Sequence, residues 1–201
     1  MRNYSLSRAH VEGSYRISVK REGASVDGGP AGFVSNHLHD HVGVGDELEI
    51  GAPCGEFTLG EPKESPVALI AGGVGITPLL AMAQHLAEAQ PDRPLYLIRG
   101  ARGQAHHAFN KELRALAESH PNMHLHIRFD DATPEDIKSG LCESGGLIDS
   151  ALLSAFLPLD EMDAYVCGPQ GMMKAVLGAL RSLGVAPERL HHEFFGPAGS
   201  L

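Results

Sequence analysis

Beyond residue 66, short apolar runs alternate along the chain with longer segments in which apolar residues recur at helical spacing. Such alternation is typical of βαβ units, which form a parallel sheet with helices packed on its faces. The pattern therefore predicts an α/β fold with a doubly wound parallel sheet. We expect strands at residues 67–71, 95–99, 124–129, 164–167 and 190–194, and helices at 78–90, 107–119, 149–156 and 171–183.

Residues that favour helix ends lie at the boundaries of these expected helices. Thr77 is suited to cap a helix N-terminus, and Pro78 suits the first helical position. Asp149 is placed to cap the helix that follows it. Gly184 stands where a helix is commonly ended by glycine. Local chemistry thus predicts two helix starts and one helix end.

The first part of the chain has a different pattern. Residues 15–20 and 47–50 alternate apolar and polar side chains with period two, which predicts short strands, and residues 34–40 predict a short helix after a glycine-rich loop. A polar stretch bracketed by prolines, residues 61–66, is typical of a linker. We therefore expect two domains, residues 1–61 and 62–201, and the first is too small to be a complete barrel.

Composition excludes several classes of function. The chain has 201 residues, with 16 Lys and Arg against 25 Asp and Glu, and its net charge of −9 repels nucleic acids and anionic membranes. Its apolar runs are interrupted well before the roughly 20 residues that a membrane span needs, and no secretory signal opens the sequence. Three unevenly spaced cysteines form no disulfide framework, which favours a cytoplasmic location.

Twelve histidines raise the question of a metal site. Positions two apart, as in His37, His39 and His41, do not share a helix face, and the adjacent pairs at 106–107 and 191–192 would point to opposite faces of a strand. No zinc or iron–sulfur spacing and no Gly-x-Ser-x-Gly elbow is present. We therefore expect no metal site, and a hydrolase is disfavoured.

A glycine-rich sequence at residues 71–78 joins an expected buried strand to an expected helix. Its glycines permit a close approach of backbone to ligand, and the amides of a helix N-terminus attract phosphate. The alternative is a tight turn without a ligand. The motif departs from the G-x-G-x-x-G fingerprint, because Pro78 replaces its last glycine and Arg99 and Arg102 stand near the end of the second strand instead of an acid. A simple NAD-specific dehydrogenase is therefore disfavoured.

A second unusual loop, Val-Cys-Gly-Pro at residues 166–169, follows a later strand and precedes a helix. In a doubly wound sheet, ligands bind at the carboxyl edge where the connection order reverses, and the first and fourth strands commonly flank that point. Both unusual loops end such strands, so together they indicate one binding crevice. Taken alone, Cys167 is more typical of a small buried hydrophobic residue than of a reactive thiol.

Five motifs occur in the order seen in the ferredoxin reductase superfamily: RNYS at 2–5, GFVSN at 32–36, GGVGITP at 72–78, CGP at 167–169 and EFFGP at 193–197. Over essentially its whole length the chain resembles this superfamily, and within it the C-terminal reductase part of bacterial flavohemoglobins, the nitric oxide dioxygenases. The resemblance implies an NAD(P)H-dependent reductase that contains FAD. Its electrons would pass from nicotinamide through flavin to the haem of a globin domain or to another one-electron acceptor.

The resemblance also implies roles for individual residues. Arg2 would pair with the flavin pyrophosphate, Tyr4 would stack on the isoalloxazine ring, and Ser5 would lie near its reactive nitrogen. Phe195 would lie against the flavin where nicotinamide enters, and Glu193 would tune the local charge. The implied catalytic residues are Tyr4, Ser5, Glu193 and Phe195. For residues 2–5 the alternative is an exposed start of the chain, and for the aromatic pair at 194–195 it is packing into the core.

The implied cofactor-binding residues cluster in the same five motifs. They are Arg2, Asn3, Tyr4 and Ser5; Gly32, Val34 and Ser35; Gly72, Gly73, Val74, Gly75, Ile76, Thr77 and Pro78; Cys167, Gly168 and Pro169; and Phe194, Phe195, Gly196 and Pro197. Thr77 and Cys167 would lie nearest the nicotinamide. Arg99 and Arg102 could reach a 2′-phosphate, so the choice between NADH and NADPH stays open.

The chain departs from the family in its first domain. The family's flavin domain is a six-stranded barrel, whereas about three strands are expected before the linker, so we expect a partial antiparallel β-barrel, truncated at the N-terminus, and no globin domain. Open barrel edges predict weak flavin binding, self-association, or completion by another chain. Two alternatives stay open: a reductase for a separate ferredoxin or oxygenase, and a non-catalytic nucleotide-binding module.

Overall fold

The computed structural model describes residues 2–24, 28–61 and 63–195. Its centre is a six-stranded sheet with the order β4-β3-β2-β1-β5-β6 in which every neighbouring pair is parallel. The strands are β1 Val67–Gly72, β2 Leu95–Ala101, β3 Met123–Phe129, β4 Ser144–Gly145, β5 Asp163–Cys167 and β6 Leu190–Glu193. The predicted doubly wound sheet is confirmed, and the short strand β4 was not anticipated.

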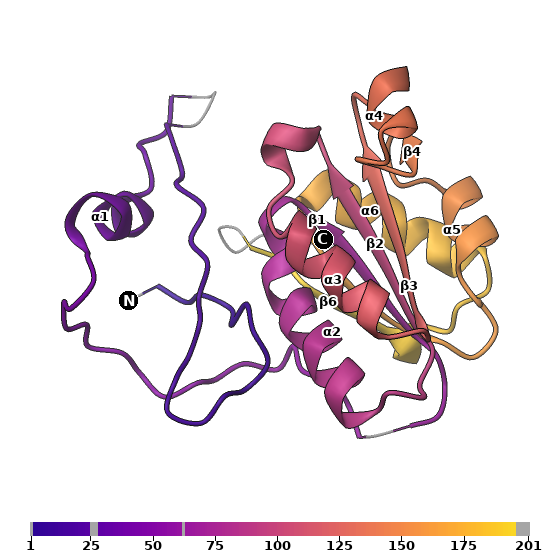
Figure 1. The fold of residues 1–201 in the computed structure, drawn as a ribbon, viewed down its shortest axis with the longest axis horizontal. Coiled ribbons are helices and arrows are strands. Elements are labelled where there is room, and N and C mark those ends of the chain that lie inside the picture. The colour runs from indigo at the N-terminus through magenta and orange to yellow at the C-terminus, as the bar shows by residue number, and fades with distance from the viewer. Residues whose placement is uncertain (1, 25–27, 62, 196–201) are drawn as a thin grey trace.

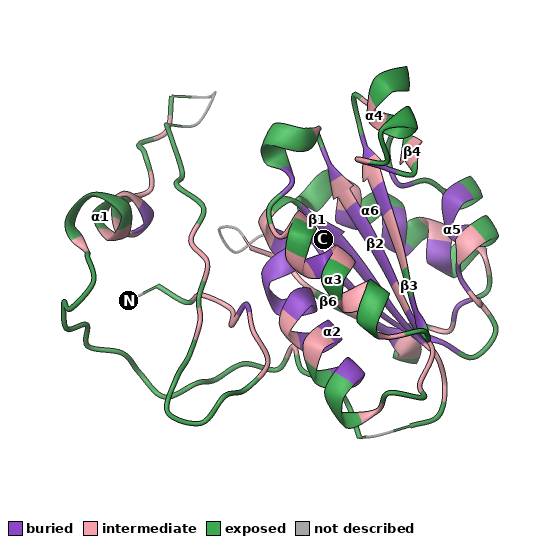
Figure 2. Cartoon of the chain, viewed as in Figure 1, coloured by how far each residue is buried: buried purple, intermediate pink, exposed green. Residues whose placement is uncertain are grey.

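Helices cover both faces of this sheet (Figure 1). On one face α2 (Ile76–Ala89) and α3 (Asn110–Ser119) bury apolar side chains of β1 and β2, while α5 (Ser150–Phe156) and α6 (Gln170–Ser182) cover the opposite face. Every residue of β1 is buried, as expected for a central parallel strand enclosed between two helical layers (Figure 2). The continuous apolar run at the start of this part of the chain is therefore a direct consequence of its central position.

Helix boundaries follow the predicted capping residues in part. Asp149 caps α5 by accepting a hydrogen bond from the Leu152 amide at 2.9 Å, and Gly184 has the positive φ of +92° that a helix-ending glycine supplies. The prediction that Thr77 is the N-cap of α2 is wrong. A 3-10 turn, Gly73–Gly75, leads directly into α2 and makes Gly75 the N-cap. The tight turn therefore starts the helix two residues earlier than the side chains suggest.

Two further helices differ from the prediction. The helix expected at 107–119 begins only at Asn110, because Phe109 adopts the left-handed conformation with φ of 65° and breaks the helical path. The short helix α4 (Pro134–Lys138) was not anticipated. Its N-terminus carries a capping box between Thr133 and Asp136, a local signal that the hydrophobic pattern alone does not show.

In the first part of the chain, the short helix is confirmed as α1, Phe33–His41. The strands predicted at 15–20 and 47–50 are wrong: within the described residues of 2–61, antiparallel pairing is limited to two isolated bridges, Leu6 to Ile17 and Val11 to Ser14. A strand needs neighbours that complete its ladder and a layer that covers its apolar face. Here the covering layer is missing, since Leu48 and Ile50 are 50% and 70% exposed.

Residues 63–66 pack against the sheet as the chain enters β1. Lys63 and Ser65 both reach the buried carboxylate of Asp163, each at 3.3 Å, and Arg93 donates a hydrogen bond to the Ser65 carbonyl at 2.7 Å. Just before it, the Gly60 amide donates to the Tyr165 hydroxyl at 3.2 Å. The chain is therefore anchored on both sides of the expected boundary. Within the described residues, no helix is long and apolar enough to cross a membrane.

Candidate functional site

The two unusual loops meet at the carboxyl edge of the sheet. β1 and β5 are hydrogen-bonded neighbours, and α2 leaves β1 toward one face while α6 leaves β5 toward the other. A Cβ atom placed on Gly75 would lie 2.2 Å from the Cys167 carbonyl oxygen, and one on Gly168 would lie 3.1 Å from the Gly72 Cα. The backbones are thus in direct contact at the reversal point where doubly wound sheets bind ligands. The structure therefore places the two loops side by side at this edge of the sheet, and a shared binding crevice there stays a prediction.

The helices that begin at this crevice are α2 and α6, and neither has a side-chain hydrogen bond at its N-cap, Gly75 or Pro169. By contrast, α4 and α5 are capped by the side chains of Thr133 and Asp149. A helix N-terminus without a side-chain acceptor suits an anionic ligand, because the amide groups and the helix dipole both favour negative charge. The crevice is therefore suited to the phosphates of a nucleotide.

The predicted residues of the glycine loop divide by exposure. Gly73 is exposed and Val74 is half-buried, so their backbone is open to a ligand. Thr77 is buried, and its hydroxyl donates to the Val74 carbonyl at 3.0 Å, so it holds the loop in shape. The remaining predicted residues of this loop are buried at the start of α2 or at the end of β1: Gly72, Gly75, Ile76 and Pro78. In the second loop Cys167 and Gly168 are buried and Pro169 is exposed.

A third group of residues, from β6 and from residues 2–18, called the N-terminal segment below, lies next to these two loops. Glu193 is the register partner of Cys167, and the Ser5 hydroxyl donates a hydrogen bond to the Glu193 carboxylate at 3.4 Å. The two aromatic residues that follow β6 are both half-buried, with Phe194 against the core under α5 and α6 and Phe195 against the core under α2. The structure thus brings Ser5 and Cys167 together around Glu193. Ser5 and Glu193 are 188 residues apart in sequence.

Burial raises the pKa of Glu193 above its usual range, and the hydrogen bond from Ser5 opposes this shift. Ser5→Ala is therefore expected to raise the pKa of Glu193 further, as measured by carbon NMR of the side-chain carboxyl group. Because the folded pKa exceeds the unfolded value of 4.5, Glu193 contributes stability at low pH that is lost as the pH rises through the folded pKa.

Two control variants accompany this titration. Glu193→Gln identifies the resonance and removes its part of the pH dependence of unfolding. Ser139→Ala removes a hydroxyl that bonds only within α4 and its C-terminus, and should leave the Glu193 titration unchanged. An unchanged or lowered pKa of Glu193 in Ser5→Ala would show that the hydroxyl does not stabilise the carboxylate.

Cys167 is protected from chemistry at its thiol. Burial, and then the nearby charge of Glu193, raise the pKa of Cys167 strongly, so the nucleophilic thiolate does not form at neutral pH. Of the three free cysteines, only Cys54 is exposed. We expect iodoacetamide at pH 8 to label Cys54 in the native protein, and all three residues after denaturation, as read by peptide mass spectrometry. Native labelling of Cys167 would contradict the buried position.

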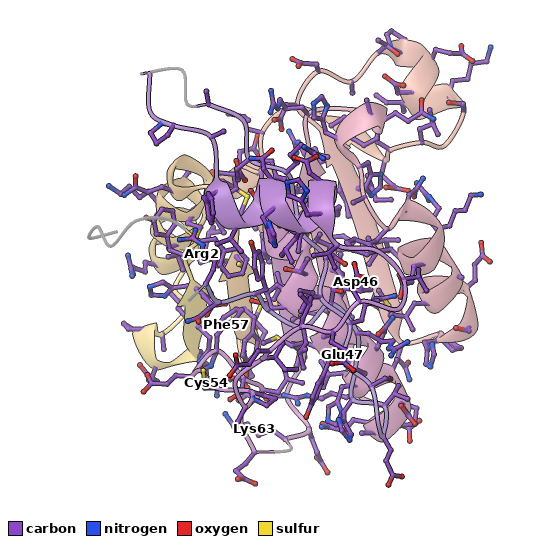
Figure 3. The ribbon with its side chains drawn as sticks, turned by 90° about the vertical axis from the view of Figure 1, so that its left-hand side faces the viewer. Arg2, Asp46, Glu47, Cys54, Phe57 and Lys63 are labelled. Carbon is purple, nitrogen blue, oxygen red and sulfur yellow. The ribbon has the colours of Figure 1, made fainter. Side chains whose placement is uncertain are left out.

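The residues proposed for the flavin lie on the N-terminal segment. Arg2 and Asn3 are exposed, whereas Tyr4 and Ser5 are half-buried. Arg2 lies on the side that faces the viewer in Figure 3. An exposed guanidinium beside a half-buried aromatic ring suits a cofactor that combines phosphate with a flat ring system. Gly196 and Pro197 lie outside the described residues.

The predicted residues at the start of α1 differ in their burial and hydrogen bonding. The Ser35 hydroxyl donates to the Gly32 carbonyl at 3.1 Å and accepts from the Glu22 amide at 3.2 Å, so it fixes the start of the helix. Val34 is half-buried, and Gly32 is an N-cap without a side-chain hydrogen bond. Beside this helix start is an open hollow of about 300 Å³, lined by Ala31, Gly32, Phe33, Asn36, His37, Asp40 and His41.

The expectation that Arg99 reaches a 2′-phosphate is wrong. Its side chain is 1% exposed, it donates to the Gly100 carbonyl at 2.8 Å, and burial lowers its pKa to about 10, which leaves a cation at neutral pH. Strand alternation directs it onto the face covered by α2 and α3, where burial and then the Arg99 charge lower the pKa of His107 to about 4. Arg102 is exposed.

Three residues that join the N-terminal segment to the helices were not anticipated. Arg16, Gln84 and Glu112 form one hydrogen-bonded network, but they are 96 and 28 residues apart in sequence. Polar residues at such distances give no periodic or motif signal, so only the folded structure reveals them. Across the described residues, no group of three His, Cys, Asp or Glu side chains is arranged to hold a metal ion.

Comparisons with known proteins agree with this geometry. Residues 69–177 match the family model of the oxidoreductase NAD-binding domain. The whole chain is 45% identical to part of a flavohemoprotein of Rhodopirellula baltica and 42% identical to part of one of Halalkalibacterium halodurans, in each case covering 49% of the relative. The chain thus spans about half the length of these curated relatives.

Solved structures are similar over almost the same length. The flavohem-like FAD/NAD-binding domain of nitric oxide dioxygenase from Vibrio cholerae has a TM-score of 0.85 and 37% identity, with 98% of this chain and 77% of that chain covered. The cytochrome b5 reductase domain of Ulva prolifera nitrate reductase has a TM-score of 0.81 and 26% identity, with 96% and 76% covered.

Proposed function

The chain belongs to the NAD-binding oxidoreductases, in the flavohemoprotein reductase family with a ferredoxin-reductase-like fold, and we propose that it is a module that transfers electrons from NAD(P)H through FAD to the haem of a globin domain. The observation that carries the proposal is the meeting of three segments at one edge of the sheet. The glycine loop after β1, the Cys-Gly-Pro loop after β5, and Glu193 with Ser5 lie next to one another at this edge.

When bound, the cofactors would supply the redox chemistry, which is hydride transfer from nicotinamide to flavin followed by one-electron transfer to an acceptor. The protein binds, orients and excludes water. Gly73 and Val74 offer backbone to the nucleotide at the N-terminus of α2, and Pro169 does so at α6. Thr77 holds the first loop in shape and Gly75 lets it pack against the Cys167 backbone, so these residues would present the loop to the nicotinamide nucleotide beside a buried, unreactive thiol.

On the flavin side, the proposed contacts come from the N-terminal segment and the end of β6. Arg2 and Asn3 bind the pyrophosphate, Tyr4 stacks on the ring system, and Gly32 and Val34 present the N-terminus of α1. Ser5 and Glu193 supply a hydroxyl and a carboxylate that, together with Phe195, would contact the flavin and the nicotinamide. Ser35 supports α1 from within, and Phe194 is a further proposed contact, as are Gly196 and Pro197, which lie outside the described residues.

In this proposal residues 1–61 bind the flavin and residues 62–201 bind the nicotinamide nucleotide, as expected for the two domains. Arg102, which is exposed at the end of β2, is the cation placed to meet a 2′-phosphate in this arrangement. Free cysteines and the absence of a membrane-spanning helix in the described chain fit the proposed cytoplasmic location. Self-association through residues 2–61 would cover Phe33 and Ile50, which are 85% and 70% exposed.

The test uses the purified chain. We expect added FAD to bind with quenching of flavin fluorescence, NADH to reduce the bound flavin anaerobically, and the reduced protein to reduce the haem of a separately purified flavohemoprotein globin domain. Failure with that haem but success with an artificial acceptor would favour a reductase for a separate ferredoxin or oxygenase. If FAD does not bind but NADH raises the melting temperature, the chain is a nucleotide-binding module and the proposal fails.

A further inference from the structure

The N-terminal segment is held against the nucleotide-binding part by a bidentate ion pair. Arg16 contacts the two carboxylate oxygens of Glu112 in α3, with Nη2 to Oε1 at 2.9 Å and Nη1 to Oε2 at 3.3 Å. The two side chains are 30% and 32% exposed, so the pair is partly shielded from water. A guanidinium that uses both arms on one carboxylate fixes orientation as well as distance.

A second helix completes this contact. Gln84 in α2 donates to Glu112 Oε1 at 2.6 Å, and its own amide oxygen accepts a hydrogen bond from the Ala9 backbone at 3.0 Å. The segment is therefore held at two points, Ala9 and Arg16, by residues from two helices that pack on the same face of the sheet. Arg16, Gln84 and Glu112 together are called the docking network below.

The turn between these two points is itself closed. The Ser7 amide donates to the Arg16 carbonyl at 2.8 Å, the Arg16 guanidinium donates to the Ser7 carbonyl, and the hydroxyls of Ser7 and Ser18 are 2.8 Å apart. The Arg16 guanidinium also lies 5.7 Å from the centre of the Phe109 ring, a cation–π distance. Residues 7–16 therefore move with the docking network as one unit.

Ser5 lies two residues before this unit, and its hydroxyl is the group that meets Glu193. We propose that the docking network is a positioning device, which sets the place of residues 2–5 opposite Glu193 and hence the alignment of the two cofactors. This role rests on the proposed function. Arg16, Gln84 and Glu112 are positioning residues, because they touch the segment and the helices and lie outside the three segments that border the crevice.

The positioning role predicts a local effect that needs no cofactor. In Glu112→Gln the Ser5 hydroxyl should no longer be held within hydrogen-bonding distance of the Glu193 carboxylate. The pKa of Glu193 should therefore rise, as is expected for Ser5→Ala. Loss of the Glu112 charge by itself would lower the pKa of Glu193, because one negative charge is removed. The sign of the shift in the NMR titration therefore separates repositioning from simple electrostatics.

Hydrogen exchange gives a second readout of the same protein without ligand. In Glu112→Gln and in Arg16→Met, amides of residues 5–9 should exchange roughly fivefold faster, while amides of β1 and β5 keep the rates of the parent protein. Arg16→Lys, which keeps the charge but loses the fork, should be intermediate. Glu118→Gln removes one exposed charge from the same helix and should change neither readout.

With FAD bound, the same variants should lower the rate of flavin reduction by NADH about tenfold with the KM for NADH unchanged, since the nucleotide loops are untouched. The proposal is overturned if the pKa of Glu193 falls or stays constant in Glu112→Gln, or if exchange accelerates equally in β1 and β5, which would indicate a general loss of stability. An unchanged reduction rate in an FAD-loaded variant also overturns it. If the parent chain binds no FAD, the proposed function fails, while the titration and exchange experiments still decide on the docking network.

Discussion

Gly75→Ala is expected to destabilise the protein by about 3 kcal/mol and to abolish the contact between the two loops of the crevice. The new methyl group would lie 2.2 Å from the Cys167 carbonyl oxygen and 2.3 Å from its carbonyl carbon. Both are backbone atoms of β5, so no side-chain rotation relieves the overlap. Because Gly75 has an ordinary helical φ of −60°, the effect is purely steric, and the loops must separate.

Urea unfolding measures this loss, and the change in melting temperature on adding NADH measures the loss of the crevice. The matched control is Gly178→Ala in α6, where an added methyl group meets nothing within 4 Å. This control should stabilise the protein by about 0.5–1 kcal/mol, because alanine is the better helix former. If Gly75→Ala unfolds at the same urea concentration as the parent, the loops are not packed as closely as the structure shows.

Asp163→Ala is expected to cost about 3 kcal/mol, as removal of one partner from a buried ion pair commonly does. The Asp163 carboxylate is 4% exposed and lies 3.7 Å from the guanidinium of Arg93, whose side chain is 7% exposed. Burial lowers the pKa of Arg93, and the charge of Asp163 opposes that shift. Without Asp163, Arg93 stays charged in a site that no longer compensates it, and Lys63 and Ser65 lose their shared acceptor.

Thermal and urea unfolding again provide the measurement. The double variant Asp163→Leu with Arg93→Met should recover part of the lost stability, because it removes the buried cation together with its partner. Asp92→Asn, which changes an exposed carboxylate next to Arg93, should unfold like the parent. An effect of Asp163→Ala no larger than that of Asp92→Asn would mean that the ion pair contributes little.

Much of the α/β part could be predicted because its elements are specified locally. The strand at residues 67–72 is a continuous apolar run, and a run of that kind is stable only between two layers. Asp149 and Gly184 act within one helical turn of themselves, so their effects are visible in the sequence. Thr77 shows the limit of such reasoning, since the 3-10 turn before it leads directly into α2 and starts the helix at Ile76.

The first part of the chain was predicted less well because period-two alternation describes a strand only when partners exist. Residues 15–20 and 47–50 alternate correctly, yet the structure gives them no continuous ladder and leaves Ile50 exposed. Arg99 was misassigned for a related reason. Its polar type suggested a surface role, but strand alternation places it on a face that α2 and α3 cover.

By itself, the sequence determined the order of the βαβ units, the two glycine-containing loops and the resemblance in five motifs, because each of these depends on residues that are near neighbours in the chain. Only the tertiary structure decided that Gly75 touches Cys167, that Ser5 meets Glu193, and that Arg16, Gln84 and Glu112 form a docking network. These contacts join residues many positions apart, and their energies depend on distance and burial in the folded protein, which no local pattern encodes.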